Sequence, residues 1–342
     1  MEKMKLVCLG DAAITMDLME PMKELEKYGV DVVLMEDEGI QTVQAFTEIM
    51  LKVEREGADA CPANRKFCEA AKDADIVAVH LSPVNREVLA AAAKLKYVAV
   101  LRSGIENVSE ALCRERGIRI LNAPGRSAHA VADYTLAMLL AQARNVARSH
   151  KLLMEGKWVK KYPNNSDIHD LRNCTVGVVG AGQIGRKVID RLRGFGCGIL
   201  VHDPFLPDGE LERLGYTPAG LDDLLRQSDF VTLHLRLSEK TARFISGREL
   251  GLMKKTACLI NTARAGLVDE AALIEALQTK AIGGAALDVF EEEPLGTESP
   301  FLRLDNVTIT PHLAGTCADT LTNSVEIIKN ALEELLRAMY HA

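Results

Sequence analysis

Short apolar runs alternate with amphipathic stretches along the first third of the chain. A run of four or five mostly apolar residues predicts a buried strand, and apolar residues spaced three or four apart predict a helix. Because the two kinds of segment alternate, we expect a parallel sheet with helices on both faces. The predicted strands are Lys5–Leu9, Asp31–Met35, Ile76–His80, Tyr97–Leu101 and Ile118–Leu121, and the clearest helices are Asn85–Leu95 and Val108–Arg116.

The alternation stops at the sequence Asn-Ala-Pro-Gly, residues 122–125, which is a candidate hinge. The next stretch predicts a single long helix from about Ala128 to Glu155. This helix is apolar around much of its circumference, so we expect it to be buried inside a domain or against a second subunit. The polar segment 160–170 that follows is expected to be a surface loop.

A second alternation of strands and helices begins at Thr175. Six predicted strands with a glycine-rich turn after the first match the full dinucleotide-binding fold. The chain then ends in an amphipathic helix, Thr320–Met339, whose packing partner the spacing leaves open. The predicted strands are Thr175–Val179, Gly198–Val201, Phe230–Leu235, Ala257–Asn261, Gly284–Leu287 and Val307–Ile309, and the helices are Gln183–Arg193, Leu221–Arg226, Gly247–Leu252 and Glu270–Thr279.

The turn after the strand Thr175–Val179 has the pattern Gly-x-Gly-x-x-Gly, formed by Gly180, Gly182 and Gly185. It follows a strand, opens a helix and precedes Asp203 at the end of the next strand, which is the dinucleotide-binding arrangement. There the first glycine allows a tight turn, the second admits a pyrophosphate and the third lets helix and strand pack closely. Asp203 would bind the adenosine ribose and repel a 2′-phosphate, which predicts NAD(H) over NADP(H). The alternative to a cofactor site is an ordinary strand–turn–helix in which the glycines serve only close packing.

Polar residues follow three later strands, outside the carboxyl ends where an open parallel sheet binds its ligands. Arg264 follows one predicted strand, the acidic run 291–293 follows the next, and His312 follows the last. Each of these residues alone is more often structural than catalytic. Their shared position after successive strands, downstream of a cofactor turn, favours a catalytic group at the nicotinamide end of a cofactor.

Such a group suits oxidation of a 2-hydroxy acid or reduction of a 2-keto acid. The cofactor carries the hydride between nicotinamide C4 and the substrate C2. Histidine is well suited to move the hydroxyl proton near neutral pH, and a carboxylate bonded to it favours its charged form and fixes its tautomer. Arginine binds the substrate carboxylate, or polarises the keto oxygen, through paired N–H donors.

Composition limits the alternatives. The chain has 342 residues, enough for two domains, and its net charge of −7 argues against a nucleic-acid partner. No apolar segment resembles a signal peptide or a membrane span, so we expect a cytoplasmic protein with no membrane partner. We predict no metal site. No Cys-x-x-Cys pair occurs among the eight cysteines, which are expected to be free thiols: Cys8, Cys61, Cys68, Cys113, Cys174, Cys197, Cys258 and Cys317.

These motifs resemble those of the D-isomer-specific 2-hydroxyacid dehydrogenases, which include phosphoglycerate, glyoxylate/hydroxypyruvate and D-lactate dehydrogenases. The resemblance covers nearly the whole chain and implies that the catalytic residues are Arg264, Glu293 and His312. The match to a Glu-Pro pair selects Glu293 from the three adjacent acids. The matching segments are Asn122-Ala-Pro-Gly with Ala130-Val-Ala-Asp133, the glycine turn, Asn261-Thr-Ala-Arg264, Leu287-Asp-Val-Phe-x-x-Glu293-Pro and Pro311-His312-x-Ala-Gly315.

The resemblance also implies a split architecture, α/β with two doubly wound domains. Residues 1–122, completed by the C-terminal helix at 316–342, would form a flavodoxin-like substrate domain. Residues 123–315 would form an inserted Rossmann NAD-binding domain. A homodimer built partly on the helix after residue 125 is implied as well.

Ligand contacts follow from the same resemblance. The loop that would bind the substrate carboxylate through backbone N–H groups consists of Arg102, Ser103 and Gly104, with Ser82 nearby. Backbone N–H groups of Gln183 and Ile184 would meet the pyrophosphate. Further residues would line the path from adenosine to nicotinamide: His234, Arg236, Thr262, Ala263, Asp288 and Gly315.

The chain departs from the family pattern at four positions. Asp133 stands in place of the usual glutamate and Ala265 in place of the more frequent glycine, and neither change alters the expected chemistry. Arg236 replaces a usual proline and could accept a 2′-phosphate, so NADP(H) stays an alternative that Asp203 outweighs. Arg102 is an uncommon choice in the substrate loop and favours a substrate with extra hydroxyls or a second anionic group.

Two further functions are alternatives. The family includes corepressors that keep the dehydrogenase fold and bind partner peptides, so a non-catalytic NAD(H)-sensing protein is the alternative to an enzyme. The absence of long disordered tails disfavours it. A phosphoglycerate dehydrogenase without an appended regulatory domain is a narrower option within the enzyme class.

Overall fold

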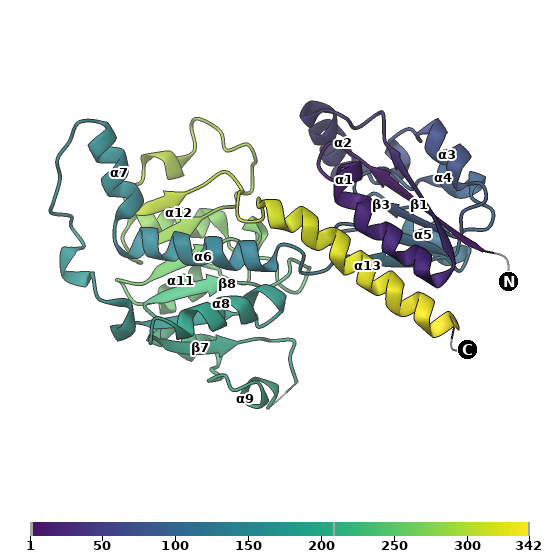
Figure 1. Ribbon diagram of the computed structural model, residues 1–342. Coiled ribbons are helices and arrows are strands. Elements are labelled where there is room, and N and C mark those ends of the chain that lie inside the picture. Colours follow the sequence, from purple (N-terminus) through teal and green to yellow (C-terminus); the bar gives the residue numbers. More distant parts are fainter. Residues whose placement is uncertain (1–2, 208, 341–342) are drawn as a thin grey trace. The chain divides into compact units, whose positions relative to one another are not determined.

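The computed structural model describes residues 3–207 and 209–340, which form two compact units (Figure 1). The first unit contains the chain as far as Ser127 and the segment from Cys317 onward, and the second contains Ala128–Thr316. Residues 123–127, expected in the inserted domain, therefore lie with the first unit, and Thr316 lies with the second. Residues 1, 2, 341 and 342 of the predicted substrate domain, and residue 208 of the predicted NAD domain, fall outside the described residues.

A five-stranded parallel sheet forms the centre of the first unit. Its strand order, β2-β1-β3-β4-β5, is the flavodoxin-like order. The five predicted strands are confirmed to within one residue at each end. Nearly every residue of the three central strands is buried, as expected for a sheet covered on both faces. The strands are β1 (Met4–Gly10), β2 (Val30–Glu36), β3 (Ile76–Val79), β4 (Tyr97–Val100) and β5 (Arg119–Asn122).

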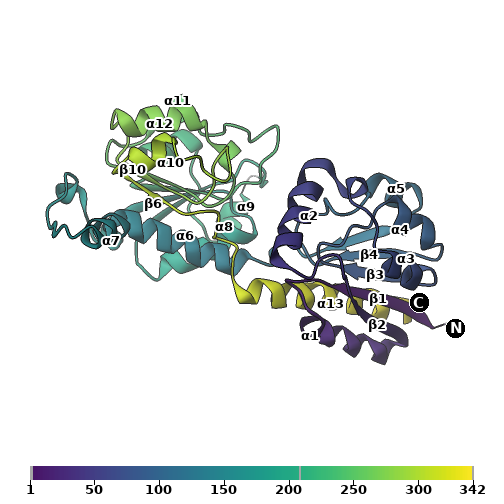
Figure 2. The ribbon, with the colours of Figure 1, turned by 90° about the horizontal axis from the view of Figure 1, so that it is seen from above.

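Two hydrophobic clusters cover the faces of this sheet because alternate side chains of a strand point to opposite faces. Leu6 and Cys8 of β1 face one cluster, and Val7 and Leu9 face the other. The C-terminal helix α13 (Ala318–Tyr340) packs into the first cluster, so the chain returns to the first unit. The other helical segments are α1 (Met16–Met19), η1 (Glu20–Tyr28), α2 (Val43–Glu56), η2 (Ala58–Ala60), α3 (Arg65–Ala71), α4 (Arg86–Ala91) and α5 (Glu110–Glu115). Figure 2 shows α1 and α13 along one face of the sheet and α3, α4 and α5 along the other.

The second unit has a six-stranded parallel sheet in the order β11-β10-β9-β8-β6-β7. A single parallel bridge between Val201 and Pro218 adds a further pairing outside β7. With this bridge the order is that of the Rossmann fold, in which the third strand along the chain, here the position at Pro218, lies at one edge of the sheet. The predicted fold class is therefore confirmed. The sequence pattern did not predict this pairing. The strands are β6 (Thr175–Val179), β7 (Gly198–His202), β8 (Phe230–Leu233), β9 (Cys258–Asn261), β10 (Gly284–Leu287) and β11 (Val307–Ile309).

Helices cover both faces of the second sheet. The α-helices of this unit are α6 (Ala128–Ala143), α7 (Val146–Met154), α8 (Gln183–Arg193), α9 (Glu210–Arg213), α10 (Leu221–Gln227), α11 (Gly247–Leu252) and α12 (Glu270–Gln278). One hydrophobic cluster contains buried residues of α6 and α8, and another contains those of α10, α11 and α12. Short 3-10 turns lie at Asn165–Asp167, Leu171–Asn173, Ala265–Leu267 and Pro300–Arg303.

The predicted single helix from Ala128 to Glu155 is wrong, because the structure divides it into α6 and α7. Asn145, between the two helices, has φ = 52°, a left-handed conformation that stops an α-helix and that asparagine tolerates better than most residues. Half of the residues of α6 are buried, whereas α7 has no buried residue. The sequence predicted that the whole stretch from Ala128 to Glu155 is buried. Within this chain, that prediction holds for α6 alone.

Candidate active site

Each of the three glycines after β6 is required for a different structural reason. Gly180 has φ = +100°, and a Cβ there would lie 2.8 Å from the carbonyl carbon of His234. A Cβ on Gly185 would lie 1.9 Å from the carbonyl oxygen of Gly180, so only glycine lets the helix approach the turn. Gly182 differs, because a Cβ there would meet nothing within 4 Å. Its open side leaves room for a ligand against the backbone.

Helix α8 begins directly at this open turn, and Gly182 caps it without a side-chain hydrogen bond. The first N–H groups of an α-helix, here including those of Gln183 and Ile184, have no acceptor within the helix and carry the positive end of its dipole. A pyrophosphate matches both the space and the charge. The turn is therefore suited to hold a dinucleotide.

Asp203 is tied to the glycine turn by hydrogen bonds. Its Oδ2 accepts from the N–H of Ala181 at 2.7 Å, and its Oδ1 accepts from the N–H of Phe205 at 2.9 Å. Each carboxylate oxygen keeps further accepting capacity for ribose hydroxyls, and the negative charge opposes a 2′-phosphate. Arg236 is exposed in the loop after β8, and its carbonyl oxygen accepts from the hydroxyl of Thr241.

His234 is partly buried beside the glycine turn, and the Nδ1 atom of its ring is buried. Burial lowers the pKa of His234 to about 3, so the imidazole stays neutral. Its Nε2 lies 3.0 Å from the hydroxyl of Thr232, and its backbone N–H donates to the carbonyl oxygen of Val179 at the end of β6. His234 thus supports the glycine turn from within the fold.

His312 and Glu293 meet after β11 and β10. The Nδ1 of His312 lies 2.7 Å from Oε2 of Glu293, and both side chains are partly exposed. The other oxygen of Glu293 accepts from the N–H of Phe290 at 2.9 Å. The glutamate is therefore held in place, and a neutral His312 that donates its Nδ1–H has its Nε2 lone pair directed elsewhere.

A buried carboxylate shapes the turn that carries His312. Asp288 is completely buried; its Oδ1 accepts from the N–H of Leu313 and the hydroxyl of Thr310, and its Oδ2 accepts from the N–H of Ala314. His312 itself has φ = 54°, in the left-handed region that a histidine rarely adopts. The hydrogen bonds to Asp288 on both sides of His312 hold this conformation.

The loop that carries Arg264 is held in a similar way. Asn261, at the end of β9, accepts from the N–H of Ala263 at 3.0 Å and donates to the carbonyl oxygen of Arg264 at 2.9 Å. The hydroxyl of Thr262 lies 2.7 Å from that of Thr135 in α6. Arg264 is exposed, and its Nη1 donates to the carbonyl oxygen of Ala263.

Residues expected to bind the cofactor and substrate differ in their exposure. Thr262 is buried, whereas Ala263 and Gly315 are partly exposed. In the first unit, Ser82 is 1% exposed and its hydroxyl donates to Asp37 at 2.6 Å, so this hydroxyl is occupied.

The predicted substrate loop is anchored to the start of the segment after β5. The N–H of Ala123 donates to the carbonyl oxygen of Arg102, and Asn122 donates to that of Ser103. The hydroxyl of Ser103 donates to the carbonyl oxygen of Ala123 at 3.0 Å, and Gly104, the last residue of the loop, is partly exposed.

Three positioning residues were not identified from the sequence: Thr135, Thr310 and Phe290. The contact of Thr135 is made from a different helix, far from Thr262 in the chain. Thr310, by contrast, stands two residues before His312, where its hydroxyl reaches Asp288. Proximity to a catalytic candidate is the sequence signal that could have identified Thr310.

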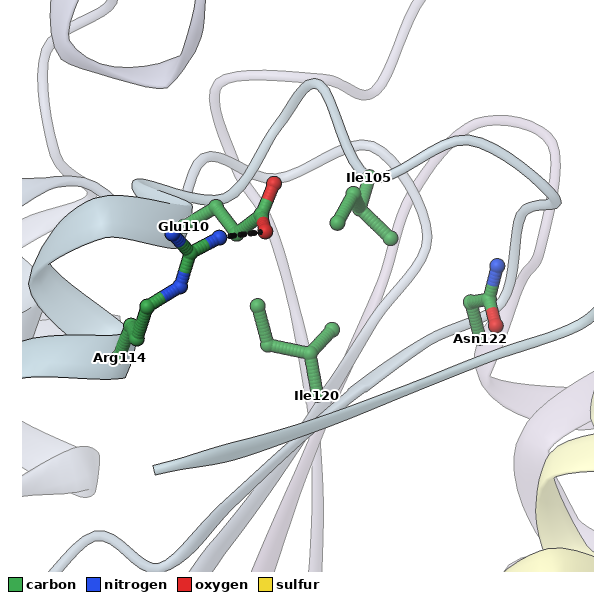
Figure 3. Close-up of a pocket in the computed structure, with 5 residues that line it drawn as sticks. All are labelled: Ile105, Glu110, Arg114, Ile120 and Asn122. Carbon is green, nitrogen blue, oxygen red and sulfur yellow. Dashed lines mark hydrogen bonds and ion pairs between the residues drawn. The ribbon is translucent and has the colours of Figure 1, made fainter. Parts of the chain in front are cut away.

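A cavity of about 290 Å³ lies elsewhere in the first unit, beside the edge strand β5 (Figure 3). Its lining residues are Ile105, Glu110, Arg114, Ile120 and Asn122. Arg114 and Glu110 form an ion pair of 2.6 Å at its wall. None of the predicted catalytic or ligand-binding residues lines it.

The described part of the chain contains no cluster of three or more His, Cys, Asp or Glu side chains that could hold a metal ion. Each of the eight cysteines is a free thiol. Among the helices of residues 3–207 and 209–340, none is both long and apolar enough to span a membrane.

Comparison with known proteins places these features in one family. Residues 136–314 match the family model of the D-isomer specific 2-hydroxyacid dehydrogenase NAD binding domain. The chain is 38% identical over 276 residues to a glyoxylate reductase from Korarchaeum cryptofilum. The aligned residues cover 80% of this chain and 83% of that protein. The fold also matches a crystal structure of a D-lactate dehydrogenase from Treponema pallidum, with a TM-score of 0.76, 25% identity, and coverage of 98% of this chain and 97% of that one.

A D-3-phosphoglycerate dehydrogenase from Methanocaldococcus jannaschii is 37% identical over 274 residues. The match covers 80% of this chain and 52% of that protein. This chain therefore spans about half the length of that relative.

Replacing Asp288 by asparagine tests the origin of the His312 turn. An amide turns one accepting oxygen into a donor that faces an N–H group, so we expect Asp288→Asn to lower the free energy of unfolding by about 1–3 kcal/mol. Urea denaturation measures this change. Asp167→Asn, at an exposed position in the 3-10 turn Asn165–Asp167, is the matched control and should change it little. Equal stability of Asp288→Asn and the control would refute the assignment.

Replacing Asp203 by alanine tests cofactor choice. The variant loses the acceptor for the ribose hydroxyls and the charge that opposes a 2′-phosphate. We expect the ratio of KM for NADP(H) to KM for NAD(H) to fall by about tenfold or more, as for a lost charged hydrogen bond. Steady-state kinetics with both cofactors measures the ratio. Asp190→Ala removes the same charge from the exposed face of α8 and should leave it unchanged.

Proposed function

The chain belongs to the D-isomer specific 2-hydroxyacid dehydrogenases, NAD-dependent enzymes, and we propose that it interconverts a 2-hydroxy acid and its 2-keto acid with His312, Glu293 and Arg264 as catalytic residues. The observation that carries this proposal is the 2.7 Å contact between His312 and Glu293. It joins an acid–base group and its partner at the carboxyl ends of two neighbouring strands, in the same sheet as the dinucleotide turn.

The cofactor site has its own proposed contacts. Bound NAD(H) would accept or supply the hydride at its nicotinamide C4. The backbone N–H groups of Gln183 and Ile184 would hold the pyrophosphate, and Asp203 would hold the adenosine ribose. Ala263 and Gly315, both partly exposed, would line the path toward the nicotinamide, together with the exposed Arg236. Thr262 and Asp288 are buried and, together with the partly buried His234, would shape this path from behind.

His312 would move the proton. Glu293 accepts the Nδ1–H of His312 and so fixes which ring nitrogen carries that proton. In reduction, the protonated Nε2 donates its proton to the keto oxygen as C2 receives the hydride. In oxidation, the neutral Nε2 accepts the hydroxyl proton. The contact that Glu293 makes with the N–H of Phe290 keeps the carboxylate facing the ring.

Arg264 would hold the substrate. Its exposed guanidinium offers paired N–H donors to the substrate carboxylate or keto oxygen, and the hydrogen bonds of Asn261 fix the backbone from which it projects. The loop of Arg102, Ser103 and Gly104 would supply backbone N–H groups to a substrate carboxylate. Because the hydroxyl of Ser82 is already bonded to Asp37, Ser82 would act through its backbone.

A cytoplasmic homodimer remains part of the proposal. Several apolar side chains of α7 and the segment after it are exposed, Val146 at 56%, Leu153 at 53%, Met154 at 76% and Trp158 at 79%. A second copy of the chain would remove them from water. The eight free thiols suit a reducing compartment.

A panel of 2-keto acids with NADH tests the proposed activity by the loss of NADH absorbance. Turnover of at least one acid is expected. Tight NADH binding without turnover of any acid would refute the enzyme and favour the non-catalytic NAD(H) sensor.

His312→Ala tests the proton-transfer role. We expect kcat to fall by about 10²–10⁴-fold, the usual contribution of a general acid–base group, with Kd for NADH little changed. Glu293→Gln should reduce kcat less, because the amide oxygen still accepts the Nδ1–H. His169→Ala, in an exposed loop of the same unit, is the control. An unaltered kcat in His312→Ala would remove it as the proton donor.

Arg264→Ala tests substrate binding. The variant should lose about a hundredfold or more in kcat/KM, a loss typical of one removed electrostatic donor. Arg303→Ala removes an exposed guanidinium that pairs with Glu298 and serves as the control. Near-normal kcat/KM in Arg264→Ala would show that another residue holds the acid.

A further inference from the structure

Two cysteines lie at the same level of the second sheet, each directly before one of two neighbouring strands. β6 and β7 pair in parallel, with Thr175 opposite Gly198, and Cys174 and Cys197 come one residue earlier. The N–H of Gly198 donates to the carbonyl oxygen of Cys174 at 3.0 Å, so the ladder extends to Cys174. Cys174 is itself in an extended conformation. The two cysteines are therefore opposite each other across one strand spacing.

Both cysteine side chains lie on the same face of the sheet. Alternate residues of a strand share a face. Val176 of β6 and Ile199 of β7 are partners in the register, and each comes two residues after one of the cysteines. Val176, Ile199, Cys174 and Cys197 all belong to the hydrophobic cluster that contains buried residues of α6 and α8. Register and packing thus agree that the two thiols are neighbours.

This placement has the backbone spacing that a disulfide needs. Neighbouring strands lie about 4.8 Å apart, and disulfide-bonded residues have Cα atoms about 4.4–6.8 Å apart. The Sγ of Cys174 now donates to the carbonyl oxygen of Asp170 at 3.6 Å. The Sγ of Cys197 donates to the carbonyl oxygen of Leu192 at 3.6 Å. Because a thiol is a weak donor, turning either sulfur toward the other loses little.

The two thiols differ in their access to solvent. Cys174 is 6% exposed, whereas Cys197 is partly exposed and follows Gly196 in the turn after α8. Burial raises the pKa of both thiols, and the charges of Asp229 and Cys197 add to the rise at Cys174. Both thiols are therefore mostly protonated at neutral pH and react slowly. Cys197 is the one of the two that a dissolved oxidant reaches first.

We propose that Cys174 and Cys197 are a modification site that forms a reversible disulfide on exposure to hydrogen peroxide. The thiolate of Cys197 attacks one peroxide oxygen, the O–O bond breaks, and the departing hydroxide takes up the proton that the thiol released. The thiol of Cys174 then attacks the resulting sulfenic acid. The S–S bond forms, the S–O bond breaks, and water leaves with the thiol proton. The two thiols lose two electrons, which reduce one peroxide to two water molecules.

The bond closes a loop around the dinucleotide-binding segment. The chain from Cys174 to Cys197 contains β6, the glycine turn and α8. Both cysteines lie at the amino ends of their strands, whereas Gly180 and Asp203 follow the carboxyl ends. The disulfide therefore restricts the unfolded chain without touching the cofactor site, and it acts as a reversible lock on the fold of the second unit. Its formation does not depend on the proposed reaction.

Peptide mapping of the cofactor-free chain tests the pair. Treatment with hydrogen peroxide, then alkylation and digestion, should give a peptide that links Cys174 to Cys197 and disappears after reduction with dithiothreitol. Phenylarsine oxide, which binds two neighbouring thiols, should protect both cysteines of the reduced chain from alkylation. Cys68→Ser removes the other partly exposed thiol whose pKa burial raises, and it should change neither result.

Thermal unfolding tests the lock. Peroxide should raise the Tm of the native chain by about 5 °C or more, as for a disulfide that closes a loop of this length, and dithiothreitol should reverse the rise. Cys174→Ala and Cys197→Ser should each abolish the shift, whereas Cys68→Ser should keep it. Each variant is compared with itself in the oxidised and reduced states, so a lower starting Tm does not affect the result.

Two results would overturn the modification site. One is the absence of a linked peptide from the oxidised native chain. The other is oxidation of Cys197 to a sulfinic acid while Cys174 stays free to react with the alkylating agent. A linked peptide without a change in Tm would overturn the lock and support the modification site alone.

Discussion

The turn that carries His312, in the proposed active site of the second unit, depends on the buried carboxylate of Asp288. A buried charge must be satisfied by hydrogen bonds, and this one takes them from Thr310, Leu313 and Ala314. Those contacts lie on both sides of His312 and hold it in a left-handed conformation. The imidazole then meets Glu293 at 2.7 Å. The proposed proton-transfer group is thus positioned by a charge that is itself completely buried.

Both units place their polar side chains at the carboxyl edges of parallel sheets. In the second unit this edge carries the glycine turn, Arg264, Glu293 and His312. In the first it carries Asp11, after β1, and His80, after β3, whose Nδ1 lies 3.0 Å from the Asp11 carboxylate. The interior strands supply mostly hydrophobic packing, and polar strand residues such as Asn261 of β9 and Thr232 of β8 support the loops beside them. A parallel sheet separates stability from function in this way, because the polar residues lie in the loops that follow its strands.

Local patterns predicted the strands well and failed where a single residue or a distant contact decided the outcome. Apolar runs identified the eleven strands that the structure describes in residues 3–207 and 209–340, because buried parallel strands need largely apolar sequence. The break between α6 and α7 depends on the conformation of Asn145 alone, which the surrounding helical pattern concealed. The edge pairing at Pro218 is a single bridge and has no strand-length pattern. The occupied hydroxyl of Ser82 depends on Asp37, which is remote in the chain.

The sequence by itself determined the two α/β units, the dinucleotide turn, and the candidates Arg264, His312 and an acid of the run 291–293. The resemblance to a known family then selected Glu293 from that run. These are properties of residue type and of spacing within short segments. The tertiary structure alone decided which side chains touch: His312 meets Glu293, Asp288 is completely buried, and the hydroxyl of Ser82 bonds to Asp37. Such contacts join residues far apart in the chain, and they follow from how strands order themselves in a sheet, which no local pattern specifies.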